Sequence, residues 1–356
     1  MSELAEKRRR LHRLMDAEGL DALVLRRPGN AAWYSGGGRT NILAVQEAGV
    51  AAIVVRRDGD EVVTAVNEAP RLEAEELGGL GARFTVLPWN ADATSALPTG
   101  DDVGVDGTLP GRRDVSGLVE AARRSLTDPE LDRYRSLGQD AAEALTNACQ
   151  TAEPAWSEYD LAALAAAGLV QRGVDPVVLL VAGEQRLPEH RHPLPTGERL
   201  GALAMVVVCA RRQGLIASLT RFVAFGGLAP DCADAYERLL HVDAAFNRAT
   251  TPAARVGDVF AAGLAAYEDQ GFGRDQATLH HQGGPTAYEP RDYVADETSD
   301  ALVEDGQAFA WNPSVPSLKS EDTVVARADG PEIVTVDPRW PTSEIEGLAR
   351  PGVLER

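Results

Sequence analysis

The chain has 356 residues, a length that favours two domains over a single hydrophobic core. An apolar fraction of 44% and a charged fraction of 25% are typical of a globular protein, and no apolar run is long enough for a membrane span. The formal net charge of −19 argues against binding to nucleic acids or anionic membranes, because phosphate contacts need clustered Lys and Arg.

The cysteines and the first residues bear on the compartment. Residues 1–20 contain basic side chains with no apolar stretch after them, which predicts an amphipathic surface helix rather than a signal peptide. The three cysteines, Cys149, Cys209 and Cys232, are odd in number and widely spaced. This pattern favours a reducing cytoplasm over a disulfide framework, with each cysteine a small buried residue.

The first part of the chain alternates predicted helices and strands, which indicates an α/β domain with a mixed sheet over residues 1–126. Pro28, Gly29 and Asn30 predict a turn, and the residues after them are expected to lead into a loop. Helices are expected over residues 7–18 and 70–77, strands at 21–27 and 83–89, and a hairpin of 49–55 and 61–66 that turns at 58–59.

The second predicted domain, residues 127–356, opens with a long helix that ends near residue 151. Thr127 or Asp128 is its N-cap, and Pro129 lies in its first turn. Ser157 and Asp160 have the spacing of a capping box and predict the start of a second helix. Strands are then expected at residues 175–183 and 203–225, and helices at 234–250 and 256–270.

Several segments of the chain have a recognisable order. RLHRLMDAEGLDALVLRRPGNAAWYSGG lies near its start, and SLTDPELDRYRSLGQDAAEAL covers most of the predicted long helix. PEHRHPLPTGERL, GLIASLTRFVAFG, HHQGG and SEDTVV then follow. In this order the segments resemble the N-terminal domain, the interdomain helix and the C-terminal domain of the creatinase and Xaa-Pro peptidase family. The resemblance implies an α/β protein whose C-terminal domain has the pita-bread fold, and a homodimer that acts on a small-molecule substrate.

The resemblance also implies a set of metal ligands, because catalytic members of the family hold two divalent metals with two Asp, one His and two Glu. The matching positions in this sequence are Val207, Ser218, His281, Asn312 and Glu321. Only the His and the last Glu are kept, and one carboxylate cannot offset two divalent ions. We therefore expect no metal cofactor, or at most a single divalent ion near His281 and Glu321.

Creatinase is a metal-free member of the family, and the resemblance to it implies a metal-independent hydrolase or lyase for a C–N bond of a small amino-acid-like, guanidino or amide molecule. His190 is the expected general acid or base, and His281 and Glu321 are the other expected catalytic residues. Substrate contacts are expected from residues of the emptied metal cavity and its surroundings: Val207, Ser218, Arg221, Tyr288 and Asn312.

Other interpretations stay open at this point. The chain could be a metal-dependent Xaa-Pro dipeptidase or aminopeptidase, or a non-catalytic binding protein with the same fold. A single-metal site of three imidazoles and Glu321 is chemically reasonable, although the resemblance lets only His190 and His281 converge. His192 and His280 then make structural hydrogen bonds, and Arg221 either pairs with Glu321 or contacts the substrate.

The segment Gly283-Gly284-Pro285 also has two readings. It is expected to form a tight turn beside the pocket rather than a phosphate cradle, because no helix follows it.

Overall fold

The computed structural model describes residues 2–44 and 46–356, and these form two compact units. One unit runs to Glu130 and includes Gln213–Leu215. The other consists of Leu131–Arg212 and Ile216–Arg356. In the described part of the chain, no helix combines the length and the apolar character needed to cross a bilayer.

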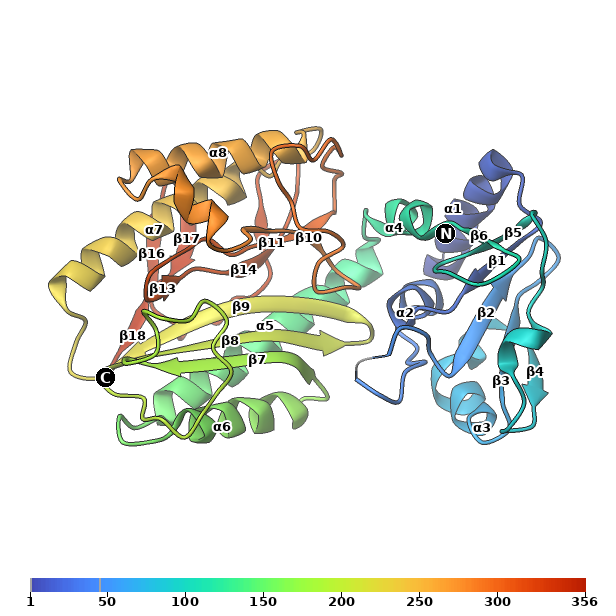
Figure 1. Ribbon diagram of the computed structural model, residues 1–356, viewed down its shortest axis with the longest axis horizontal. Helices are drawn as coiled ribbons and strands as arrows, with labels where there is room; N and C mark the ends of the chain where they lie inside the picture. The colour runs from blue at the N-terminus through green and yellow to red at the C-terminus, as the bar shows by residue number, and fades with distance from the viewer. Residues whose placement is uncertain (1, 45) are drawn as a thin grey trace. The chain divides into compact units, whose positions relative to one another are not determined.

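The first unit is built on a mixed sheet with the strand order β4-β3-β2-β1-β5-β6 (Figure 1). The β2–β3 pair is the predicted hairpin, with Ile53 opposite Val62. Strand β1 pairs antiparallel with β2 and parallel with β5, which confirms the mixed sheet. The strands are β1 (Ala22–Leu25), β2 (Ala51–Val55), β3 (Glu61–Ala65), β4 (Arg83–Leu87), β5 (Val103–Val105) and β6 (Arg113–Asp114).

Helices of the first unit are α1 (Glu3–Glu18), α2 (Pro28–Ser35), α3 (Ala69–Arg71) and α4 (Ser116–Arg123), and a π-helical turn, Leu72–Glu76, continues α3. The turn predicted at Pro28 is wrong, because Pro28 opens α2, where a proline at the first position costs no hydrogen bond. Asp106 explains the difference: its carboxylate accepts from the backbone N–H groups of Arg26 and Arg27 and from Asn30 Nδ2, and so fixes the start of the helix.

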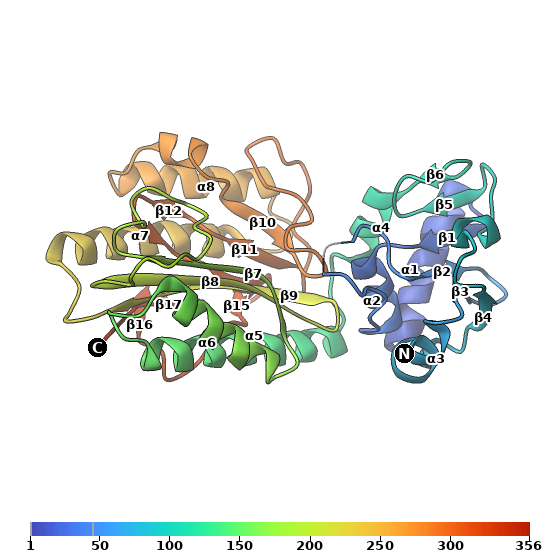
Figure 2. The same ribbon diagram turned by 60° about the horizontal axis from the view of Figure 1, so that its bottom comes forward.

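The second unit begins in α5 (Asp128–Thr151), close to the predicted long helix. Its other helices are α6 (Glu158–Val170), α7 (Pro230–Ala249) and α8 (Val256–Asp269). The capping box at the start of α6 is confirmed, since Ser157 Oγ accepts from the Asp160 N–H and the Asp160 carboxylate accepts from the Ser157 N–H. Figures 1 and 2 show α5 and α6 on one side of strands β7 to β9, and α7 and α8 on the other.

Two sheets form the centre of this unit, with strand orders β18-β9-β8-β7 and β10-β11-β14-β15. The two sheets share with α7 and α8 an apolar core that includes Phe222, Phe246 and Trp311. The strands are β7 (Asp175–Gly183), β8 (Leu203–Arg212), β9 (Leu215–Ala224), β10 (Gly283–Thr286), β11 (Ala308–Trp311), β14 (Asp322–Val325), β15 (Glu332–Ile333) and β18 (Val353–Glu355). Shorter pairs are β12 (Ser314–Val315) with β13 (Leu318–Lys319), and β16 (Thr342–Ile345) with β17 (Leu348–Pro351).

Buried charges tie these sheets to the helices. Arg350 of β17 contacts Asp243 of α7 and Asp322 of β14, and none of the three side chains is more than 3% exposed. Arg221 of β9 lies 2.9 Å from the other oxygen of Asp322. An unpaired charge at this depth would cost several kcal/mol, so these pairs fix where the start of β14 lies.

Candidate functional site

Backbone hydrogen bonds bring the motif segments of the second unit together. Register places Gly283 of β10 and Asp322 of β14 opposite Trp311 of β11. Beyond that row, the Asn312 N–H donates to the Gln282 carbonyl at 3.0 Å. The sheet therefore holds the residues before β10, after β11 and before β14 side by side, although they are distant in sequence.

Three histidines converge at this place. His192, from the loop between β7 and β8, and His280 and His281, which precede β10, each offer a ring nitrogen, and these atoms lie within 4.8 Å of one another. The Nε2 atoms of His192 and His280 are 3.0 Å apart. His280 Nδ1 lies 3.2 Å from Ser314 Oγ. His281 Nδ1 is buried and has no hydrogen-bond partner among the described residues.

The surroundings keep these imidazoles neutral. Burial lowers the pKa of His280 to about 2 and that of His281 to about 4. Burial also lowers the pKa of His192, and the nearby Lys319 charge acts in the same direction. At neutral pH the cluster therefore presents nitrogen lone pairs rather than positive charge.

Glu321 lies at the start of β14 and carries the anionic charge of the site. Arg291 Nη2 lies 2.8 Å from its Oε1, and Lys319 Nζ lies 3.1 Å from its Oε2, to which Thr220 Oγ1 also donates. Burial alone would raise the pKa of this carboxyl, but the Lys319 and Arg291 charges outweigh burial and lower it. Glu321 is therefore an ionised carboxylate that is already neutralised by two cations of the chain.

The remaining positions that the resemblance assigns to metal ligands hold no second anion. Val207 is part of the apolar core, and Ser218 Oγ donates to Cys209 Sγ at 3.2 Å. Asn312 is buried, and its Oδ1 has no hydrogen-bond partner in the described chain. Two divalent ions need several carboxylates, so these residues do not fit a two-metal centre.

Arg221 has a different partner from the one considered above. Its guanidinium pairs with Asp322 and donates to the Thr335 carbonyl, and the residue is 3% exposed. The suggested pair with Glu321 is wrong, because Arg291 and Lys319 fill that place. Tyr288 is buried at 2% exposure near the end of β10.

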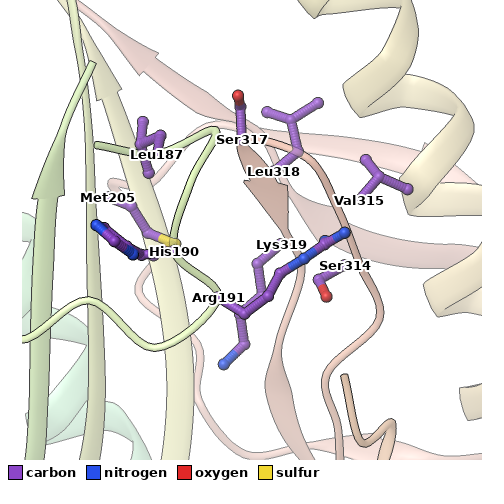
Figure 3. A pocket seen from close by; sticks show the side chains of 9 residues that line it. All are labelled: Leu187, His190, Arg191, Met205, Ser314, Val315, Ser317, Leu318 and Lys319. Atoms are coloured by element: carbon purple, nitrogen blue, oxygen red, sulfur yellow. The ribbon is translucent and has the colours of Figure 1, made fainter. Parts of the chain in front are cut away.

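His190 lies apart from the histidine cluster. Its side chain is 45% exposed, and its Nε2 lies 3.8 Å from a Glu189 carboxylate oxygen. It lines a small pocket together with Arg191, Met205, Ser314 and Lys319. Figure 3 shows His190 beside Met205, whereas the guanidinium end of Arg191 lies near Ser314. The ring that joins His281 is that of His192, contrary to the expectation that the fold would admit only His190.

His192, Arg291 and Lys319 are not among the residues assigned to this site from the sequence. His192 has a usable signal, because it also stands three residues before a proline, Pro195. Arg291 and Lys319 have none, since surface and buried cations look alike in a sequence. The segment Gly283-Gly284-Pro285 is strand β10 rather than the predicted tight turn, and Gly283 adopts a φ of 96° within it.

Comparisons with known proteins agree with this fold. Solved structures of a prolidase from Pyrococcus horikoshii OT3 and an Xaa-Pro dipeptidase from Bacillus anthracis both superpose with a TM-score of 0.79 at 16% identity. The matches cover 94% and 99% of this chain, and 99% and 100% of the other chains. The N-terminal domain of the FACT complex subunit SPT16 from Cicer arietinum matches with a TM-score of 0.68 at 15% identity, over 94% of this chain and 96% of the other.

These identities show the shared fold and nothing finer. A comparison with curated protein sequences gave no match. The sequence model of metallopeptidase family M24 matches residues 132–329, more than half of the chain. With its mixed α/β architecture and pita-bread fold, the chain belongs to metallopeptidase family M24.

Proposed function

We propose that this chain hydrolyses a C–N bond of a small amino-acid-like or amide molecule without a paired-metal centre. One observation carries the proposal: Glu321, the only carboxylate at the five mapped ligand positions, is bound by Arg291 and Lys319. These two cations supply the positive charge that two metal ions would otherwise supply beside this carboxylate. A substrate group with partial negative charge then meets fixed positive charge, which favours a developing oxyanion.

The neutral imidazoles are the groups available to activate water in this scheme. His192 is the proposed general base, because it is the exposed member of the cluster. Burial lowers the pKa of His280 to about 2 and that of His281 to about 4, which makes these two rings weak bases that can still hold a ligand. Glu321 is a weak base as well, because its cations lower its pKa. The buried Asn312 amide, whose Oδ1 has no partner among the described residues, is the proposed hydrogen-bond acceptor for a substrate N–H group. His192 and His281 are therefore the first residues to substitute.

The test combines metal analysis with an activity screen. Protein purified without chelator is analysed for bound metals and assayed on Xaa-Pro dipeptides, N-acyl amino acids and guanidino acids. We expect fewer than two divalent ions per chain, turnover that does not require added Mn²⁺, and a loss of turnover in His192→Ala. Two ions per chain with Mn²⁺-dependent cleavage of Xaa-Pro dipeptides would overturn the proposal. A larger loss in His190→Ala than in His192→Ala would return the general base to His190.

A second candidate is a metal-dependent Xaa-Pro dipeptidase or aminopeptidase. Its support is the fold that the chain shares with the prolidase and the Xaa-Pro dipeptidase named above. A third candidate is a non-catalytic binding protein, supported by the similar fold of the SPT16 domain, which is part of a complex. The same screen separates all three, since the third predicts no turnover on any substrate.

We also propose a homodimer in a reducing compartment. The free state of Cys149, Cys209 and Cys232 supports the compartment, and the proposal of a dimer rests on the family resemblance. Sedimentation analysis of the purified chain tests the dimer, and a single species at the mass of one chain would contradict it.

A further inference from the structure

The imidazole cluster of His192, His280 and His281 has the composition of a metal site, which the proposed function does not require. We infer that these three side chains bind one divalent transition-metal ion, zinc being the best match, at a site distinct from the two-metal arrangement of the family. The inference concerns binding and goes beyond the proposed hydrolysis.

The ring nitrogens of the three histidines have a spacing close to that of the ligands of one zinc ion. A tetrahedral zinc ion with Zn–N bonds of about 2.0–2.1 Å places its ligand nitrogens about 3.3 Å apart. The Nε2 atoms of His192 and His280 are already 3.0 Å apart, and the offered nitrogen atoms of all three residues lie within 4.8 Å. Binding of one ion by all three nitrogens therefore requires the rings to turn so that the widest separation, at most 4.8 Å, closes to about 3.3 Å.

Hydrogen bonds behind the cluster orient the ring of His280. Ser314 Oγ lies 3.2 Å from His280 Nδ1, and an Nδ1–H that donates to it leaves the lone pair on Nε2, which faces His192. The Ser314 N–H in turn donates to the Tyr267 hydroxyl at 2.7 Å, so this partner is itself held in place. Metal-binding histidines have such outer partners in most known sites.

His281 supplies an independent observation. Its Nδ1 is buried and has no hydrogen-bond partner among the described residues. A buried polar nitrogen without a partner costs free energy, and coordination of an ion by this ring would remove that cost or allow the ring to turn its other nitrogen to a partner.

The ligand atoms decide which kind of metal ion the cluster binds, and the nearby charges decide how many ions it binds. The three ligands are nitrogens, which suit zinc, copper or nickel and not Mg²⁺, Ca²⁺ or Mn²⁺, which prefer oxygen. Arg291 and Lys319, which both pair with Glu321, stand next to the cluster, and their positive charges oppose a second positive ion. A single ion with an open fourth position for water or an anion is the arrangement that results.

Zinc titration of the metal-free full-length chain, followed by calorimetry, tests the inference. We expect one ion per chain. His192→Ala and His281→Ala should each weaken binding by more than the roughly 10–100-fold that loss of an outer partner costs. His241→Ala is the matched control, because this histidine lies on α7 and pairs with Glu346 outside the cluster. Circular dichroism establishes that each variant is folded.

Cobalt gives a readout that does not depend on heat. Co²⁺ bound by three imidazoles in a four-coordinate site gives intense visible absorption, which the His192 and His281 variants should lose and the His241 variant should keep. Absence of zinc binding, two ions per chain, or binding unchanged in both cluster variants would overturn the inference. Because these measurements use no substrate, their failure is distinguishable from failure of the proposed hydrolysis.

Discussion

Arg350 and Asp243 form an ion pair that is wholly removed from solvent, with Arg350 Nε 2.8 Å from Asp243 Oδ2. Arg350 also reaches Asp322, one residue after Glu321. The strand that presents Glu321 to the site is therefore anchored to α7 by buried charge. Anchors of this kind fix geometry more than they add stability, but they are costly to break on one side.

Asp243→Asn should lower the free energy of unfolding by about 3–5 kcal/mol, because it leaves the Arg350 guanidinium buried with one fewer anion. Urea unfolding followed by circular dichroism measures the change. Glu346→Gln is the control, since its pair with Arg248 is about half exposed and should be worth less than about 1 kcal/mol. Equal effects of the two substitutions would show that Asp243 has no anchoring role.

Glu321→Gln should destabilise the chain by a similar amount, because Arg291 and Lys319 would both lose their buried anion. Thermal unfolding measures the loss. The control is Glu332→Gln, which removes one of the two acidic partners of Arg135, a side chain that is 43% exposed, and should change stability by less than about 1 kcal/mol. If Glu321→Gln leaves the stability unchanged, the two cations are solvated by water and do not depend on the Glu321 carboxylate.

Asp106 should make the first unit less stable as the pH rises through a defined window. Burial raises the pKa of its carboxyl from 3.8 to about 6, so between these values the folded state binds more protons than the unfolded state. The free energy of unfolding that this group contributes is therefore highest below pH 4 and falls as the pH rises to about 6.

Urea unfolding of the native chain and of Asp106→Asn across pH 4–7 isolates this contribution. At pH 7 the variant should be less stable by about 1–3 kcal/mol, because an amide N–H₂ would face the N–H donors that open α2. A difference between the two proteins that does not change with pH would refute the raised pKa.

Gly283→Ala should prevent β10 from forming in its present place. The residue has a φ of 96°, and an added Cβ would lie 2.1 Å from the Ala310 carbonyl oxygen of β11. The atoms that the Cβ would meet belong to the backbone of Ala310 and Trp311 and cannot move aside. We therefore expect the free energy of unfolding to fall by more than about 3 kcal/mol, or the protein not to fold at all. Gly117→Ala in α4, where nothing lies within 4 Å, is the control and should be neutral or slightly stabilising.

Ser314→Ala should weaken zinc binding by about 10–100-fold without removing any ligand, because it releases the ring of His280. Calorimetric titration of the metal-free protein measures this change. Ser343→Ala, an exposed position on β16, is the control. An unchanged affinity in Ser314→Ala would mean that His280 binds through another tautomer or does not bind.

Patterns of local origin could be predicted from the sequence. The hairpin of β2 and β3, the capping box at Ser157 and the long helix up to Thr151 depend on neighbouring residues, and the structure confirms them. The helix at Pro28 was missed because the decisive partner, Asp106, lies far along the chain. Long-range packing, which no motif records, also decides which histidine of the pair His190 and His192 reaches the site.

The ammonium of Lys319 and the guanidinium of Arg291 are synthesised with the polypeptide, so they can be neither chelated nor exchanged. The positive charge beside Glu321 would therefore stay unchanged in a cell that is starved of divalent metal.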